Sequence, residues 1–247
     1  MEPADRTLYN NEIKKFILKI DFVSNDVNAF ASLVNKISKH FTRLEQRTHI
    51  NYNINVDLEQ DKEEVQRKQT PDFVLIDEGK SLNLTLSTFQ NALIIDLAKY
   101  VNNTSYKECL KIVTDAIIEL ALTIQCKRIG MRYINSFHCK TPKEIIKVLS
   151  KDKAKILSGI CQENQLSRMI VQEEYNTENS KLRLQYGVPN KYYPAVMTTY
   201  DVLLDIDSYD DSTHPFEEWD EVIKNLNHMA YGAFVKSMNS QYIESLK

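Results

Sequence analysis

The residues best suited to chemistry lie in one short alternating stretch. If Arg128-Ile-Gly-Met-Arg132 is a strand, Arg128, Gly130 and Arg132 face one side and the apolar residues face the other. Two guanidinium groups beside a bare glycine form a positively charged notch for a phosphate, a carboxylate or a partner's acidic side chain. Alternatively, acids on a neighbouring strand pair with both arginines. We take Arg128, Gly130, Arg132 and the adjacent Tyr133 as candidate binding residues, and both interpretations stay open.

A second candidate is a group of carboxylates late in the chain. Asp205 and Asp207 share one face of an expected strand, and Asp210 follows in the next turn. Paired carboxylates at a strand end can hold Mg²⁺ for phosphoryl transfer. A solvated strand face, or pairing of these acids with Arg128 and Arg132, is the simpler interpretation. We assign no catalytic residue and no cofactor, and keep the three acids as an alternative metal site of a phosphotransferase or nuclease.

Composition excludes several classes of protein. The 247 residues include five widely separated glycines, which leaves no place for a P-loop, a dinucleotide-binding fingerprint or a nucleophile elbow. The four cysteines lack paired spacing, which predicts free thiols in a reduced compartment. A net charge of -3 lacks the basic field of a general nucleic-acid binder. Without a signal peptide or a long apolar run, we expect a cytoplasmic protein with no membrane segment.

The periodicity of the chain predicts the elements that position these residues. Alternating apolar residues indicate strands over 16–22, 50–58 and 128–135, and helical spacing indicates helices from 27, 105, 141 and 214. The charged stretch 59–68 is expected to be an exposed loop or a solvated helical turn.

These elements predict an α+β fold. We expect two antiparallel sheets with long helices packed on one face, in a single compact unit 1–247. Two loosely similar halves, 10–138 and 139–247, are compatible with the order of elements. The polar face of strand 50–58 favours a covered edge, as in a homo-oligomer.

The string Arg-Ile-Gly-Met-Arg-Tyr-Ile-Asn over 128–135 resembles the signature of a sporadically distributed family of uncharacterised bacterial proteins, whose hallmark strand reads Arg-Ile-Gly-Leu-Arg-Tyr-Ile-Asn. The similarity spans nearly the whole chain, although only this strand is specific. Other agreements occur in order: Ile20-Asp21-Phe22, a long helix before the signature, and Leu203–Asp207 before a helix with Trp219, His228 and Phe234. The chain departs from the family at Asn10-Asn11-Glu12-Ile13, where a proline is usual.

The resemblance implies a setting rather than a reaction. Members of the family have no settled activity and are encountered in genomic islands beside defence or mobile-element genes. It therefore implies a non-enzymatic, protein-binding part of a bacterial antiviral-defence or toxin–antitoxin system, acting as an accessory, sensor or antitoxin-like component. The expected partner is another protein encoded nearby, and direct nucleic-acid binding is not expected. A further alternative is a peptide-binding chaperone that uses an exposed sheet face.

Overall fold

One antiparallel sheet organises the protein. The computed structural model describes residues 12–23, 27–57, 62–161, 167–177, 179–195 and 199–246, with side chains except at 51–66, 68 and 158–161. The sheet has ten strands in this part of the chain: β1 (Ile13–Phe22), β2 (Arg43–Asp57), β3 (Lys62–Asp77), β4 (Leu82–Ser87), β5 (Ala92–Leu97), β6 (Gln125–Phe137), β7 (Met169–Asn176), β8 (Lys181–Val188), β9 (Val202–Asp210) and β10 (His214–Pro215). Their order is β2-β3-β4-β5-β1-β6-β9-β8-β7, and the short β10 pairs with β6.

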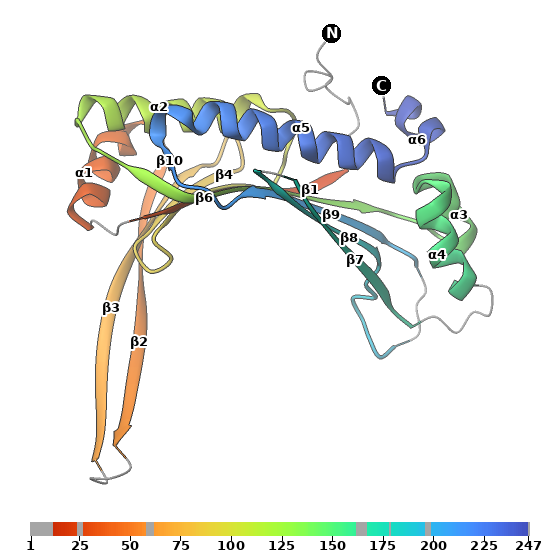
Figure 1. Ribbon diagram of the computed structural model, residues 1–247, viewed down its shortest axis with the longest axis horizontal. Helices are drawn as coiled ribbons and strands as arrows, with labels where there is room; N and C mark the ends of the chain where they lie inside the picture. The colour runs from red at the N-terminus through yellow and green to blue at the C-terminus, as the bar shows by residue number, and fades with distance from the viewer. Residues whose placement is uncertain are drawn as a thin grey trace.

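Six α-helices lie in the described ranges: α1 (Val27–Ile37), α2 (Thr104–Glu119), α3 (Pro142–Val148), α4 (Lys151–Cys161), α5 (Trp219–Ser237) and α6 (Ser240–Ser245). Figure 1 shows α2 and α5 lying across one face of the sheet, with α1 at one end and α3 and α4 at the other. None of these helices combines the length and hydropathy that a membrane crossing requires.

The core lies between the helices and one face of the sheet. Alternate residues of the central strands are fully buried there, including Phe16, Leu18 and Ile20 of β1 and Met131 of β6. The helices contribute apolar side chains such as Trp219 to the same cluster. Because side chains alternate along a strand, the residues between these buried positions lie on the other face, which no described helix covers. We call this the open face.

The α+β class is confirmed, but the prediction of two sheets is wrong and the prediction of long helices is not well supported. The sequence predicts two sheets, whereas every described strand belongs to one sheet because β1 pairs directly with β6. Long helices are not supported either, since four of the six described helices have 11 residues or fewer.

The prediction of a loop or helical turn for the charged stretch 59–68 is also wrong. From Lys62 onward this stretch belongs to β3 instead of a loop or helix, because residues 62–77 pair one-to-one with β2; residues 58–61 lie outside the described part.

A two-stranded ribbon projects from the sheet. β2 and β3 pair from Arg43↔Ile76 out to Asp57↔Lys62, whereas β4 pairs with β3 only between Asp72 and Asp77. Beyond the sheet, about ten residues of each strand continue, and at about 3.3 Å per residue they extend roughly 33 Å. Figure 1 shows this ribbon pointing away from the helices.

The chain order repeats itself across the sheet. The first half has the order β1-α1-β2-β3-β4-β5-α2. The second half has a similar order: β6, the helix pair α3 and α4, then β7-β8-β9 and α5. The strand order is symmetric about the β1–β6 pair, so β5 corresponds to β9, β4 to β8 and β3 to β7. In the described part, β2 alone of the long strands has no counterpart. The second half of this repeat therefore begins with β6, before the boundary expected at 138/139. The division into subdomains stays a prediction.

Candidate functional site

Arg128 and Gly130 lie together at the centre of the open face. The registers of β6 with β1 and β9 place Arg128 opposite Asp21, and Gly130 between Lys19 and Tyr209. The Arg128 guanidinium lies over the Tyr209 ring, 4.5 Å from its centroid. A β-carbon at Gly130 would be 2.9 Å from Arg128 Nη1. The glycine therefore leaves room for the arginine to lie flat against the sheet, and the notch is filled by Arg128 itself.

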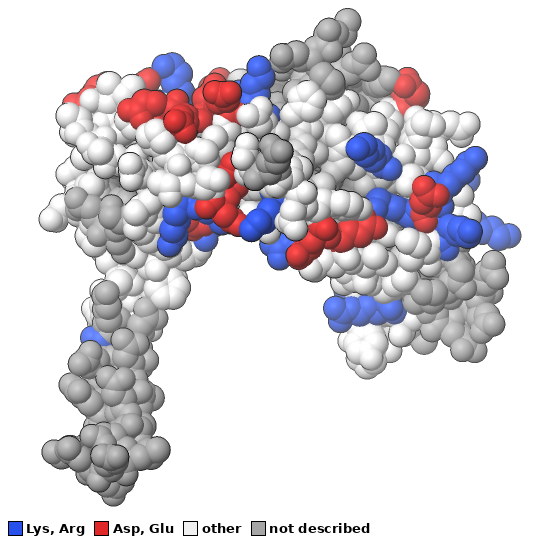
Figure 2. Space-filling model, in the orientation of Figure 1, with Lys and Arg blue, Asp and Glu red and all other residues white. Residues whose placement is uncertain are grey.

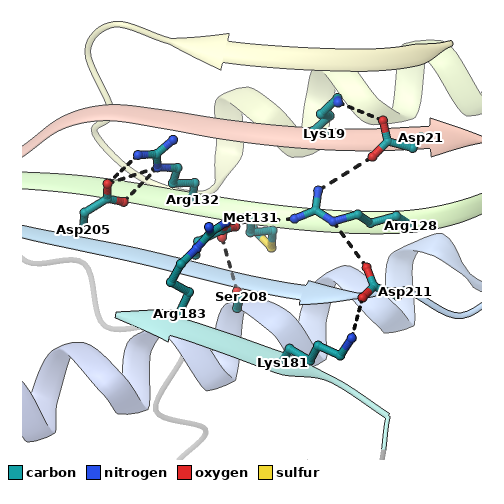
Figure 3. Close-up of polar contacts among 11 residues, drawn as sticks. Lys19, Asp21, Arg128, Met131, Arg132, Lys181, Arg183, Asp205, Ser208 and Asp211 are labelled. Carbon is teal, nitrogen blue, oxygen red and sulfur yellow. Dashed lines mark hydrogen bonds and ion pairs between the residues drawn. The ribbon is translucent and has the colours of Figure 1, made fainter. Parts of the chain in front are cut away.

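An ion-pair network extends from Arg128 to three neighbouring strands (Figure 3). Its guanidinium is 3.7 Å from Asp21 Oδ2, 3.4 Å from Asp211 Oδ1 and 3.9 Å from Asp207 Oδ2. The acids carry further partners: Lys19 Nζ is 2.9 Å from Asp21, Lys181 Nζ is 2.8 Å from Asp211, and Arg183 Nη2 is 2.8 Å from Asp207. Hydrogen bonds to Asp207 and Asp211 raise the pKa values of Arg183 and Lys181 respectively.

Arg132 forms a separate pair with Asp205. Its Nε and Nη2 donate to the two carboxylate oxygens at 2.9 Å and 2.6 Å, so the guanidinium binds the carboxylate in a bidentate manner. This hydrogen bonding raises the pKa of Arg132. The side chain of Asp205 is 7% exposed and that of Arg132 is 45% exposed. The pair thus combines an almost buried acid with a base that solvent, or a partner, can still reach.

Tyr133 does not join the arginines. It lies on the helix side, where Phe16 packs near it at a centroid distance of 4.9 Å and its hydroxyl donates to Asn227 Oδ1 at 2.8 Å. Burial raises the pKa of this phenol well above its ordinary value. Strand alternation therefore places Tyr133 in the core, on the face opposite the two arginines, and its role in binding stays a prediction.

The three candidate metal ligands are not brought together. Asp205 and Asp207 lie on the open face, but each is paired with an arginine. Asp210 alternates to the opposite side, where it accepts from the Ser212 amide at 2.7 Å and lies 3.3 Å from His214 Nε2. Among the side chains that the structure describes, no cluster of three or more His, Cys, Asp or Glu residues could hold a metal ion.

The described cysteines are free thiols, as their spacing predicts. Cys109, Cys126 and Cys139 are buried and unbonded to one another. Burial raises the pKa of Cys109 to about 12 and that of Cys139 to about 11, so neither offers a thiolate near neutral pH. The side chain of Cys161 lies outside the described part.

Sequence reasoning did not include the basic residues of β8 in the site. Lys181 and Arg183 alternate with Leu182 and Leu184, a period-2 signal that predicts a polar face. What the sequence could not supply is the register with β9, which puts Arg183 beside Asp207 and Lys181 beside Tyr209.

Neither a family model nor a curated protein sequence matches the chain. The resemblance of 128–135 to the bacterial signature stays a prediction.

Proposed function

We propose that this chain is a non-enzymatic, protein-binding component of a bacterial defence-type system, and that the open face of its sheet is the surface that binds. The observation that carries the proposal is the one-sidedness of the fold: helices cover one face, while the other presents the Arg128 network and the Arg132–Asp205 pair. The defence setting rests on the resemblance of 128–135.

Charge balance on this face favours a protein over a nucleic acid. Six basic side chains of the central strands have acidic partners there; these are Lys15, Lys19, Arg128, Arg132, Lys181 and Arg183. Figure 2 shows blue and red atoms interleaved along the sheet. A phosphate backbone is bound by surplus positive charge, whereas alternating charges complement the alternating charges of a protein surface. We therefore propose a folded protein partner with alternating charges.

A double substitution tests the proposal without leaving a lone buried charge. Arg132→Gln with Asp205→Asn removes both charges and keeps donors and acceptors in place, so we expect the fold to persist. If the partner binds the open face, its recovery with the tagged protein from the native bacterium should fall at least about tenfold.

A matched control lies on the other side of the sheet. Lys111 and Asp115 of α2 form an exposed pair at 3.0 Å, and Lys111→Gln with Asp115→Asn removes the same charges there. Full recovery is expected with this control. Equal recovery with both double variants would contradict the proposal, and binding of unfolded proteins without sequence preference would indicate the chaperone instead.

A further inference from the structure

The outer edge of β7 is an unpaired strand edge. The sheet path ends at β7, and none of the backbone hydrogen bonds found outside the strand ladders and helices involves Met169–Asn176. Within the described residues, the amides and carbonyls that point away from β8 therefore have no backbone partner. Such an edge is a template for another strand.

Most of the usual protections of an edge strand are missing at β7. Natural edges are commonly blunted by charged side chains, above all lysine, and by proline, a bulge or a very short strand, and of these β7 has only the acids Glu173 and Glu174. β7 contains no lysine or proline, and its eight residues pair with β8 without a register shift. Ile170 and Tyr175 are also 40% and 50% exposed on this strand. A weakly protected edge with exposed apolar side chains indicates a strand partner.

The repeat in the fold indicates where that partner belongs. β7 corresponds to β3, and β3 is covered on its outer side by β2. The counterpart of β2 is absent from the described part of the second half, so the position beside β7 is vacant while its equivalent is filled. A strand from outside this sheet, antiparallel to β7, would complete the symmetry.

We propose that a second copy of this chain fills the position, by antiparallel pairing of β7 with β7 about a two-fold axis at Val171. In an antiparallel ladder, the two residues of a pair either both direct their backbone groups at each other or both direct them away. When a strand pairs with its own copy, the two-fold axis must therefore pass between a residue and the same residue of the copy. Centred on Val171 and extended by one residue to Arg168, which directly precedes β7, the pairing places Arg168 of each copy opposite Glu174 of the other, and Ile170 opposite Gln172. Opposite charges across a ladder stabilise it.

The neighbouring registers lack this complementarity. Centred on Glu173, the pairing sets Glu173 against itself, which is destabilising. Centred on Gln172, it leaves Arg168 opposite Asn176 and Glu174 opposite Ile170, so neither charge has a partner. Centred on Ile170, the pairing sets Arg168 opposite Gln172, again without a charge partner. Of these four registers, only the one centred on Val171 pairs Arg168 with Glu174.

Apolar side chains beside the edge support the same pairing. Val171 is half-buried against the core on the helix side. Lys153 of α4 reaches Glu173 at 2.8 Å, which places this face of α4 beside β7. Ile156, one turn further along α4, is 45% exposed. The two-fold axis places Val171 opposite Val171 of the second copy and brings the two α4 helices toward each other. The pairing would thus cover Val171 and Ile156.

Charge reversal tests the dimer and its register together. Arg168 and Glu174 are both exposed, so Arg168→Glu and Glu174→Arg should leave the monomer folded. By sedimentation equilibrium the full-length chain is expected to approach twice its monomer mass as concentration rises. Each single variant places like charges opposite each other twice, and its dissociation constant should rise at least about fivefold.

Mixing the two variants supplies the decisive measurement. In a mixed dimer, the Arg168→Glu copy presents acids at both positions and the Glu174→Arg copy presents bases at both, so heterodimers should form where neither variant dimerises alone. Lys111→Glu, on α2 and not on a strand of the sheet, is the control with a reversed charge and should dimerise like the wild type. A wild-type chain that stays monomeric, or a mixture that does not associate, overturns the proposal. The dimer is measured by the mass of the purified chain and the open face by recovery of a partner, so the two proposals fail separately.

Discussion

At the scale of single residues, the two arginines of the 128–135 motif have different surroundings on the open face, which the motif itself does not predict. Arg128 lies flat because Gly130 has no side chain, and this places its guanidinium among Asp21, Asp207 and Asp211. Arg132 instead forms an ion pair with the nearly buried carboxylate of Asp205. The two arginines of one motif therefore differ: Arg128 is the centre of a network, and Arg132 is the one that stays accessible.

Two glycines outside the site give a matched pair of stability predictions. Gly187 has φ +152°, and a β-carbon there would overlap the Met169 carbonyl oxygen, so Gly187→Ala must displace the start of β7. Gly232 lies within α5, where a β-carbon would meet nothing within 4 Å. We expect Gly187→Ala to lose at least about 2 kcal/mol of unfolding free energy. Gly232→Ala should gain about 0.5–1 kcal/mol.

Urea titrations of both variants measure these changes. A neutral Gly187→Ala would mean that β7 can shift away from β8 without cost.

At the scale of elements, His214 joins a strand to a helix. It belongs to β10, which pairs with β6, and its Nδ1 is 3.0 Å from Glu218 while its Nε2 is 3.3 Å from Asp210. Burial acts to lower the pKa of His214, but the interactions with Glu218 and Asp210 outweigh it and raise the pKa above its ordinary value. When protonated, the imidazole of His214 therefore connects β9 and β10 to the start of α5.

This raised pKa sets the sign of a pH dependence. Because the folded state holds the proton more tightly than the unfolded chain, His214 stabilises the fold fully below its ordinary pKa of about 6.5. That contribution is lost as the pH rises through the higher pKa of the folded state. The difference in unfolding free energy between wild type and His214→Gln should therefore shrink from about pH 6 to about pH 8. A difference that stays constant would show that the proton is not held by these contacts.

Elements differ in how far the sequence predicts them. Period-2 alternation correctly places β1 and β6, because each buries alternate residues against the core. It fails for residues 62–68, where charged residues form part of β3, because a ribbon that projects beyond the core needs no apolar alternation. The site is predicted only in part, since alternation puts Arg128 and Arg132 on one face but no local signal supplies the register that selects their acids.

At the scale of the whole molecule, the ribbon of β2 and β3 is separable from the sheet. β4 supports β3 only as far as Asp72, and at the base of the ribbon Nε2 of His49 on β2 lies 2.8 Å from Asp72 Oδ2. Replacing residues 50–69 by Asn-Gly closes a hairpin just beyond His49 and Thr70. We expect Tm to change by less than about 5 °C, measured by circular dichroism. Loss of cooperative unfolding would show that the ribbon supports the sheet.

The symmetric strand order about β1 and β6 has an evolutionary consequence. Each half supplies one strand to the centre and a helix after its last strand, and the two centre strands pair antiparallel along nearly their whole length. Duplication of a half-length gene, with a homodimer fused into one polypeptide, would produce this arrangement. The β1–β6 seam would then be an ancestral subunit interface, and the short segment between α2 and β6 the junction where two genes became one.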